Sequence, residues 1–360
     1  MACPHRSSTV RLFSISASRL GLDPAQNRFH APIVYHEQYS FDGWPEKHTF
    51  PMDKFARLAH AVLTTQKSTL PSSNLPRPLV RRPEDMFRPL EYEDVPTEWF
   101  VSPTGPIDAD FFHRFTDAGL STEEKRWIGF REQCDNPALI RRTVLEVAGT
   151  VLTSQLAFKY GIASNLAGGT HHARRDMGAG YTILNDLAVA AKYLAPEKRV
   201  LVIDCDVHQG DGTATFDQIE SLYTYSIHCA SNYPHPKAHS TYDIGVADGI
   251  EDDEYLALLE ESVEEALAQT RPDIVLYDAG VDVYRYDKLG RLKLSEDGIR
   301  RRDRWVLDRC VSDGIPVAAV IGGGYDKDVD ALARRHAIVH EECGYVWRKH
   351  KLWRKCSSFS

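Results

Sequence analysis

The sequence predicts an α/β fold in which helices cover both faces of a central, mostly parallel β-sheet. Three observations support this prediction. Through the C-terminal two-thirds of the chain, apolar runs of strand length alternate with segments of helical periodicity. These apolar runs are continuous, as in parallel strands that are buried on both faces. Polar or glycine-rich residues follow directly after the runs, where open α/β sheets bind their ligands.

Apolar residues at helical spacing predict four helices. The longest begins near residue 137 and continues to about Tyr160. Pro272 ends another helix, and Ser295 is the expected N-cap of the last one. These three shorter helices are predicted over residues 186–194, 253–270 and 295–312.

Five strands are predicted beside these helices. Residues 199–204 form a continuous apolar run after a basic start, which is typical of a buried parallel strand. The other strands are expected at residues 162–166, 222–228, 273–278 and 316–321.

Composition excludes several classes of protein. The chain has 360 residues, of which 42% are hydrophobic and 26% charged, as in an ordinary globular protein. The formal net charge of −8 argues against direct nucleic-acid binding, which needs a basic surface. No apolar run approaches the roughly 20 residues that a membrane span requires. The seven scattered cysteines form no Cys-x-x-Cys pair, which favours free thiols in a reducing compartment.

Three segments outside the regular pattern have unusual composition. Residues 1–28 are rich in Arg and Ser and have no acidic residue before Asp23, which is typical of a mitochondrial or plastid transit peptide. The alternative is a solvated, disordered N-terminus of a nuclear or cytoplasmic protein. Residues 71–89 are expected to form a surface loop. Residues 346–360 form a basic tail, which we interpret as a solvated end in preference to a nuclear address.

Residues after two of the predicted strands have the chemistry of a metal site. Asp206 and His208 are two positions apart, so in extended backbone their side chains share one side. Asp282 follows another strand and can supply a third ligand. Three protein ligands leave an open position, as in a hydrolytic zinc site. Each residue alone would be an ordinary strand-end cap, and the prediction depends on the whole set.

Two adjacent histidines and a tyrosine lie in glycine-rich segments after other strands. His171 and His172 follow Gly168–Gly169, and the carboxylates of Asp204 and Asp211 are available to accept a hydrogen bond from each imidazole. Tyr325 follows a run of three glycines and has a hydroxyl that can donate to an oxyanion. Spacing alone does not pair these groups.

Taken together, these motifs resemble the ordered motifs of the histone deacetylase family over roughly residues 30–340. The matching segments are Gly168–Ala173, Gly180–Tyr181, Asn185–Asp186, Asp204–Gly212, Gly280–Asp282 and Gly322–Tyr325. His208-Gln209-Gly210 and the segment 287–290 look most like the class IV and bacterial-type branch.

The resemblance implies a fold and a set of roles. It implies one three-layer, arginase/deacetylase-like catalytic domain over residues 29–345, with a structural K⁺ beside one catalytic Zn²⁺. Asp206, His208 and Asp282 match the zinc ligands. The catalytic residues are then His172 as general base and acid, His171 as its charge-stabilising partner, Asp204 and Asp211 behind the two histidines, and Tyr325 as the oxyanion donor. Gly180, Tyr181 and Tyr233 match the acyl-lysine tunnel, and Asp204, Asp206, His208, Ser226 and Ile227 match the potassium site.

The expected reaction is therefore zinc-dependent hydrolysis of an acetyl or longer acyl amide on a lysine side chain. Two departures bear on the substrate. Tyr181 stands where many members of the family carry Phe, and residues 101–110 do not resemble the usual rim of the tunnel.

Three alternatives compete with this interpretation. A dinuclear manganese ureohydrolase of the arginase type needs a further carboxylate where this chain has Gly210. A deacetylase of acetylpolyamines or another small acylated amine would have a narrowed entrance. A catalytically inactive scaffold would lack a ligand or catalytic residue, and none is missing.

Overall fold

The computed structural model describes residues 15–64, 79–194, 198–216 and 218–354. Its main feature is a seven-stranded sheet in the order β2-β4-β9-β8-β5-β6-β7, in which every neighbouring pair is parallel. The strands are β2 (Ile33–Val34), β4 (Ile162–Asn165), β5 (Val200–Asp204), β6 (Leu222–Cys229), β7 (Tyr242–Val246), β8 (Ile274–Asp278) and β9 (Val317–Val320). A second, antiparallel sheet pairs β1 (Ala17–Arg19) with β3 (Arg88–Pro89).

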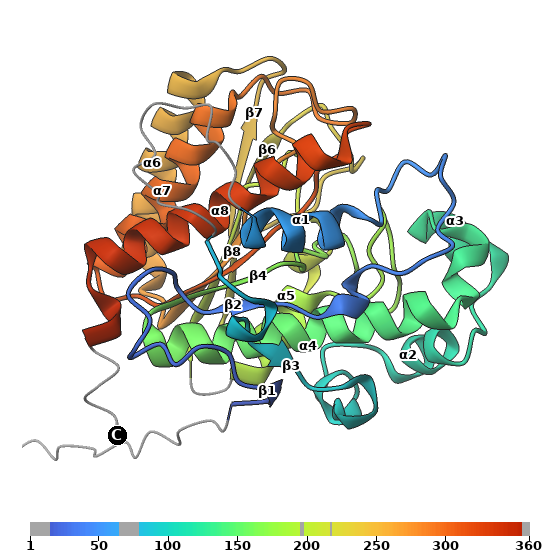
Figure 1. Cartoon of the computed structure of the whole chain (residues 1–360). Helices are drawn as coiled ribbons and strands as arrows, with labels where there is room; N and C mark the ends of the chain where they lie inside the picture. Colours follow the sequence, from blue (N-terminus) through green and yellow to red (C-terminus); the bar gives the residue numbers. More distant parts are fainter. Residues whose placement is uncertain (1–14, 65–78, 195–197, 217, 355–360) are drawn as a thin grey trace, which may run out of the picture.

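Helices cover both faces of the parallel sheet (Figure 1). On one face α4 packs on β4 and β9 and pairs with α5, whereas α8 lies on the other face with α1 and α7 beside it. The predicted three-layer α/β fold is therefore confirmed. The helices are α1 (Lys54–Leu63), α2 (Ala109–Thr116), α3 (Thr122–Ile128), α4 (Pro137–Tyr160), α5 (Asp186–Leu194), α6 (Asp252–Thr270), α7 (Glu296–Ser312) and α8 (Val329–Lys349).

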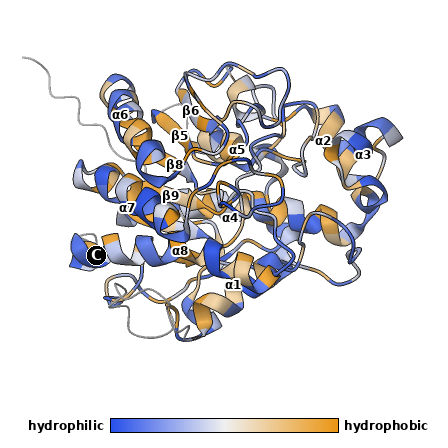
Figure 2. Cartoon of the chain, turned by 90° about the horizontal axis from the view of Figure 1, so that it is seen from above, coloured by the Kyte–Doolittle hydropathy of each residue, from blue (hydrophilic) through white to orange (hydrophobic). Residues whose placement is uncertain are grey.

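Hydropathy explains which elements are central and which are peripheral. The inner strands β5, β8 and β9 are buried along their whole length, and they are coloured apolar in Figure 2. The outer helices α6, α7 and α8 alternate between hydrophilic and hydrophobic colours because each covers the core with one face only.

The predicted elements agree with the observed ones to within two residues at most ends. As expected, the Ser295 side chain accepts a hydrogen bond from the backbone N–H of Gly298 at the start of α7. The strands β1, β2 and β3, the edge strand β7 and the helices α1, α2, α3 and α8 were not predicted. β7 alternates between partly buried and exposed residues, so it lacks the continuous apolar run of an inner strand.

The predicted chain ends differ from the structure. Ala17–Arg19 form β1 inside the segment expected to be a leader or a disordered N-terminus. Trp347 is fully buried in the last turns of α8, and its indole Nε1 donates to the Asn27 carbonyl at 2.8 Å. The basic tail predicted from residue 346 is therefore partly helix, and it contacts residues that were assigned to the leader. Residues 1–14 and 355–360 lie outside the described residues, as do 71–78 of the predicted surface loop.

None of the helices in the described part of the chain has both the length and the apolar character that a membrane crossing needs. The five cysteines within this part are buried and form no disulfide.

One buried histidine predicts an acid-sensitive stability. His340 on α8 is buried and bonded to the Ser164 hydroxyl at 2.9 Å, and burial lowers its pKa from 6.5 to about 3. The unfolded chain therefore takes up a proton as pH falls through 6.5, whereas the folded chain does not until about pH 3. The contribution to stability is complete above pH 6.5 and is lost on acidification, by about 2 kcal/mol at pH 5.

Replacing His340 with Gln should make the free energy of unfolding fall less steeply between pH 6.5 and pH 5. Urea titrations at a series of pH values measure this slope. An unchanged slope in the variant would show that His340 protonates as readily in the folded as in the unfolded chain.

Candidate functional site

The predicted site residues follow four strands that are neighbours in the sheet. β4 is followed by the paired histidines, β5 by Asp206 and His208, β8 by Asp282 and β9 by Tyr325. Since parallel strands bring their carboxyl ends to one edge, these side chains meet although they are far apart in the sequence.

Asp206, His208 and Asp282 converge on a single point. The Nδ1 atom of His208 lies 3.1 Å from Oδ1 of Asp206 and 3.1 Å from Oδ2 of Asp282. One ligand atom from each residue lies within 4.8 Å of the other two. All three side chains are buried.

Backbone N–H groups hold the far oxygens of both carboxylates. Val207 N–H donates to Oδ1 of Asp282 at 2.8 Å, and Gly323 N–H donates to Oδ2 of Asp206 at 2.8 Å. Oδ2 of Asp282 is buried, and among the described residues its near neighbour is the His208 imidazole at 3.1 Å. Two buried carboxylates that face one imidazole fit a divalent metal.

The pKa values of the two aspartates, Asp206 and Asp282, shift in opposite directions. Burial opposes ionisation of Asp206, but the His171 and His208 rings hold its pKa well below the usual range. Burial and the Asp206 carboxylate raise the pKa of Asp282 to about 6. The two carboxylates therefore repel each other, and a cation between them would relieve that repulsion.

A buried arginine joins the two turns that carry the trio. The Arg302 guanidinium donates to the carbonyls of Cys205 (3.0 Å) and Gly280 (2.7 Å) through Nη1, and to that of Ala279 (3.2 Å) through Nη2. Cys205 precedes Asp206, and Ala279 and Gly280 follow β8. Arg302 lies on α7, which was predicted as a helix, but its contacts with these turns were not predicted.

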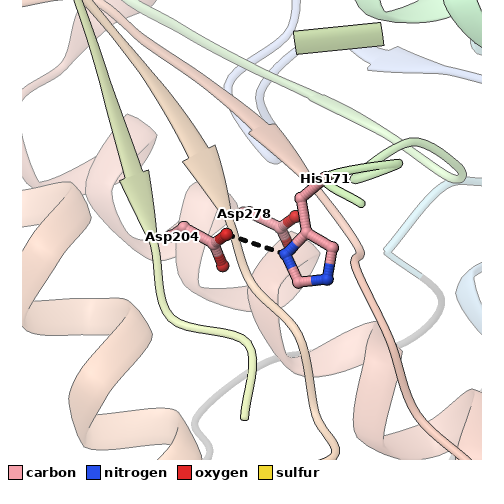
Figure 3. A group of neighbouring side chains, drawn as sticks. All are labelled: His171, Asp204 and Asp278. Carbon is pink, nitrogen blue, oxygen red and sulfur yellow. Dashed lines mark hydrogen bonds and ion pairs between the residues drawn. The ribbon is translucent and has the colours of Figure 1, made fainter. Parts of the chain in front are cut away.

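The two histidines form separate carboxylate pairs. Nδ1 of His171 lies 2.7 Å from Oδ2 of Asp204, and Nδ1 of His172 lies 2.6 Å from Oδ1 of Asp211. Figure 3 shows the first pair. The structure therefore brings together the pairs that sequence spacing left open. Arg174 donates to the other oxygen of Asp211 at 2.9 Å, a contact that was not predicted.

The paired histidines differ in proton affinity. Burial opposes protonation of His171, yet the Asp204 and Asp206 carboxylates raise its pKa well above the usual value. Burial and the neighbouring His171 lower the pKa of His172 to about 4, although Asp211 partly offsets them. The two shifts are opposite in direction, so His171 holds a proton more strongly than His172, which separates a charge-bearing partner from a base.

Asp278 is an additional buried acid that sequence reasoning missed. Its Cα pairs with that of Asp204 across β8 and β5, and it lies beside His171 and Asp204 (Figure 3). Neither carboxyl oxygen has a hydrogen-bond partner among the described residues. Burial and the Asp204 carboxylate raise the pKa of Asp278 well above the usual value, so the neutral acid is favoured.

Two more carboxylates position the loop before the histidines. Asp186 accepts from the backbone N–H groups of Gly169 (3.1 Å) and Thr170 (2.8 Å). Glu146 accepts from Gly168 N–H at 3.1 Å. Because these groups are buried, the loop has little freedom to rotate.

Tyr325 and Lys54 line the small inner cavity of about 40 Å³ that also contains His171, His172, Asp206 and His208. The backbone N–H of Tyr325 donates to Asp287 at 2.7 Å, which fixes the start of the segment. Lys54 is buried and donates to the Gly322 carbonyl at 3.1 Å, and burial lowers its pKa to about 8. Sequence reasoning did not identify Lys54, because it lies on a helix that was not predicted.

Aromatic rings line the way out of this cavity. The Tyr233 ring packs edge-on against His172 with centroids 4.8 Å apart, and the Tyr181 ring stacks on Phe130 at 5.7 Å. Gly180 has a φ of +54°, and a Cβ atom there would lie 2.5 Å from Cδ2 of His172, so glycine is required for the close approach.

The predicted potassium site involves β6. Ser226 is the Cα partner of Asp204 across β5 and β6, and its hydroxyl lies 3.0 Å from Nδ1 of His228. Ile227 follows it in the same strand. The binding of potassium by Asp204, Asp206, His208, Ser226 and Ile227 stays a prediction.

An α/β protein with this buried trio beside carboxylate-bonded histidines has the arrangement of metal-dependent hydrolases. Residues 110–341 match the family model of the histone deacetylase domain, and the chain belongs to that family.

Comparisons with known proteins agree with this assignment. The chain is 40% identical to an uncharacterized protein of Picosynechococcus, over 88% of this chain and 99% of that protein. It is 34% identical to histone deacetylase 2 of Arabidopsis thaliana, over 51% of this chain and 49% of the relative. The crystal structure of the HDA15 HD domain has the same fold, with a TM-score of 0.64, 17% identity, and coverage of 91% of this chain and 98% of that one.

The family and its deacetylase members make this chain an amidohydrolase. Its place in the class IV or bacterial-type branch stays a prediction.

The contacts of Arg302 predict a change in metal affinity. An Arg302→Lys variant keeps one charge but replaces the planar guanidinium, which reaches the three carbonyls through two Nη atoms, with a single ammonium nitrogen, so the turns carrying Asp206 and Asp282 should lose their alignment. We expect the affinity for a divalent metal to fall about 10- to 100-fold, as for other residues that orient ligands.

Competition with a chelator of known affinity measures this effect. Arg304→Lys is the matched control, since Arg304 lies on the same helix but pairs with Glu342 of α8. Equal metal affinity in both variants would contradict the positioning role of Arg302.

Proposed function

We propose that this chain hydrolyses N-acyl amides of lysine side chains, with one Zn²⁺ held by Asp206, His208 and Asp282. The observation that carries the proposal is the convergence of one buried ligand atom from each of these residues within 4.8 Å of the other two, with Oδ2 of Asp282 3.1 Å from Nδ1 of His208. A zinc ion bound there supplies a Lewis acid that polarises the amide carbonyl and activates water at neutral pH.

The two histidines divide the work of proton transfer. His172, neutral and bonded to Asp211, accepts the proton of the attacking water and returns it to the leaving amine. His171, protonated and bonded to Asp204, stabilises the negative charge that develops. The opposite directions of their pKa shifts support this division.

Tyr325, which lines the same cavity, supplies the oxyanion donor. Its hydroxyl donates to the carbonyl oxygen as this oxygen becomes an oxyanion. Burial and the nearby Asp282 carboxylate raise its pKa well above the usual value, so the tyrosine keeps its proton. Tyr181 and Tyr233 hold the aliphatic stem of the acylated side chain, and the products are a carboxylate and a free amine.

The alternatives fit less well. For the arginase-type centre, a side chain at position 210 would collide, since a Cβ there would lie 2.3 Å from Oδ2 of Asp204. An inactive scaffold has no need of the metal trio and two carboxylate-bonded histidines. A structural potassium ion, a leader within residues 1–28 and a mitochondrial or plastid location remain part of the proposal.

The reaction is tested with acetyl-, myristoyl- and trifluoroacetyl-lysine peptides and acetylpolyamines, each with and without a chelator. We expect turnover of at least one amide that stops on chelation and returns with Zn²⁺. If no amide is turned over by zinc-loaded protein, the proposed function is wrong.

Two substitutions test the roles of the side chains. His172→Ala should lower kcat at least about 100-fold because it removes the base. Tyr325→Phe should lower kcat about 100- to 1000-fold with little change in KM, because the hydroxyl acts in the transition state. Steady-state kinetics at fixed zinc separates kcat from KM. A His172→Ala variant with full activity would remove that residue from its role.

A further inference from the structure

We propose that the tunnel mouth is a subsite for the apolar residues that flank an acyl-lysine in a polypeptide, with Trp127 as its main contact. This inference rests on the proposed function, because it assigns a substrate class to the same site. It selects a polypeptide over an acetylpolyamine.

The mouth is wide and continuous with the catalytic cavity. Its volume is about 770 Å³, and its inner wall includes His172, Tyr181, His208 and Tyr325, which also line the small cavity. A space of this size exceeds what a linear amine needs, but it accommodates residues on both sides of a modified lysine. The narrowed entrance expected for a small-amine deacetylase is not observed.

The outer wall exposes large apolar side chains. Trp127 is 56% exposed, Tyr233 39% and Leu289 36%. Among the described residues seven large hydrophobic side chains are exposed, and three of them line this one opening. Such a concentration around a cleft marks a binding surface, because isolated exposed residues would be scattered over the molecule.

Backbone hydrogen bonds hold the wall in place. Gly180 N–H donates to the Trp127 carbonyl at 3.3 Å, and Tyr181 N–H donates to the Ile128 carbonyl at 2.8 Å. These bonds attach the end of α3 to the tunnel wall. On the other side, the Asn232 amide donates to the Leu289 carbonyl at 2.8 Å. A wall that is ordered before binding loses little entropy when the substrate arrives.

Charges at the mouth do not favour a polycation. Glu123 and Arg126 both line the opening, so the one carboxylate among its described lining residues is accompanied by a guanidinium. The Asp211 carboxylate, which contacts His172, already bonds both His172 and Arg174. A polyamine that enters leaves its remaining ammonium groups without free carboxylates, whereas uncharged flanking residues lose no such partners.

The experiment compares zinc-loaded wild type with zinc-loaded Trp127→Ala on three substrates. The first is a peptide whose acetyl-lysine is flanked by Phe, the second is the same peptide with Ser in place of Phe, and the third is acetylspermidine. The wild type should prefer the Phe-flanked peptide. In the variant, KM for that peptide should rise about tenfold with kcat unchanged, because only ground-state binding is lost. The Ser-flanked peptide should change less than about twofold.

Leu258→Ala is the matched control. Leu258 is also an exposed apolar residue (38%), but it lies on α6, on the opposite side of the molecule from α3 in both views (Figures 1 and 2). It should leave all three substrates unchanged. Equal KM values for wild type and Trp127→Ala on the Phe-flanked peptide, or a higher kcat/KM for acetylspermidine than for either peptide, would overturn the proposal.

A binding measurement separates this proposal from the proposed function. Fluorescence anisotropy of the labelled Phe-flanked peptide is measured on zinc-loaded His172→Ala protein, with and without Trp127→Ala. About tenfold weaker binding in the double variant supports the subsite even if the chain hydrolyses none of the amides. Equal binding in the two proteins contradicts the subsite whatever the activity.

Discussion

The close approach of Asp206, His208 and Asp282 is the constraint on which the rest of the site depends. Two buried carboxylates that face one imidazole repel each other, and burial makes that repulsion costly. Two sets of hydrogen bonds offset this repulsion. Backbone N–H groups bond the outer oxygens, and Arg302 bonds the carbonyls of both turns, so the inner oxygens are held toward a common point. A bound divalent cation would supply positive charge at that point.

The same principle explains the difference between the histidines. His171 lies beside the Asp204 and Asp206 carboxylates, which raise its pKa, and a charge on His171 in turn lowers the pKa of His172. Neither ring is free to rotate, because each is bonded to its own aspartate. The wide mouth is continuous with this charged interior, because His172, His208 and Tyr325 line both spaces.

Much of the fold was predictable because inner strands and long helices have strong local patterns. The continuous apolar runs before Asp204, Asp278 and Gly322 predicted β5, β8 and β9. β2 has two residues and α3 has seven, which is too short for a periodic pattern to be recognised. The C-terminal basic segment was interpreted as solvated because its charges conceal the burial of Trp347.

The sequence by itself determined the chemical types of the site residues and their place after strands, because motif spacing and apolar runs are local properties. Only the tertiary structure decided which groups touch. The pairs His171–Asp204 and His172–Asp211, the three bonds of Arg302, and the buried Lys54 and Asp278 all depend on strand order in the sheet and on helices from distant parts of the chain. Spacing along a chain carries no information about such contacts, because residues brought together by parallel strands are separated by whole helices.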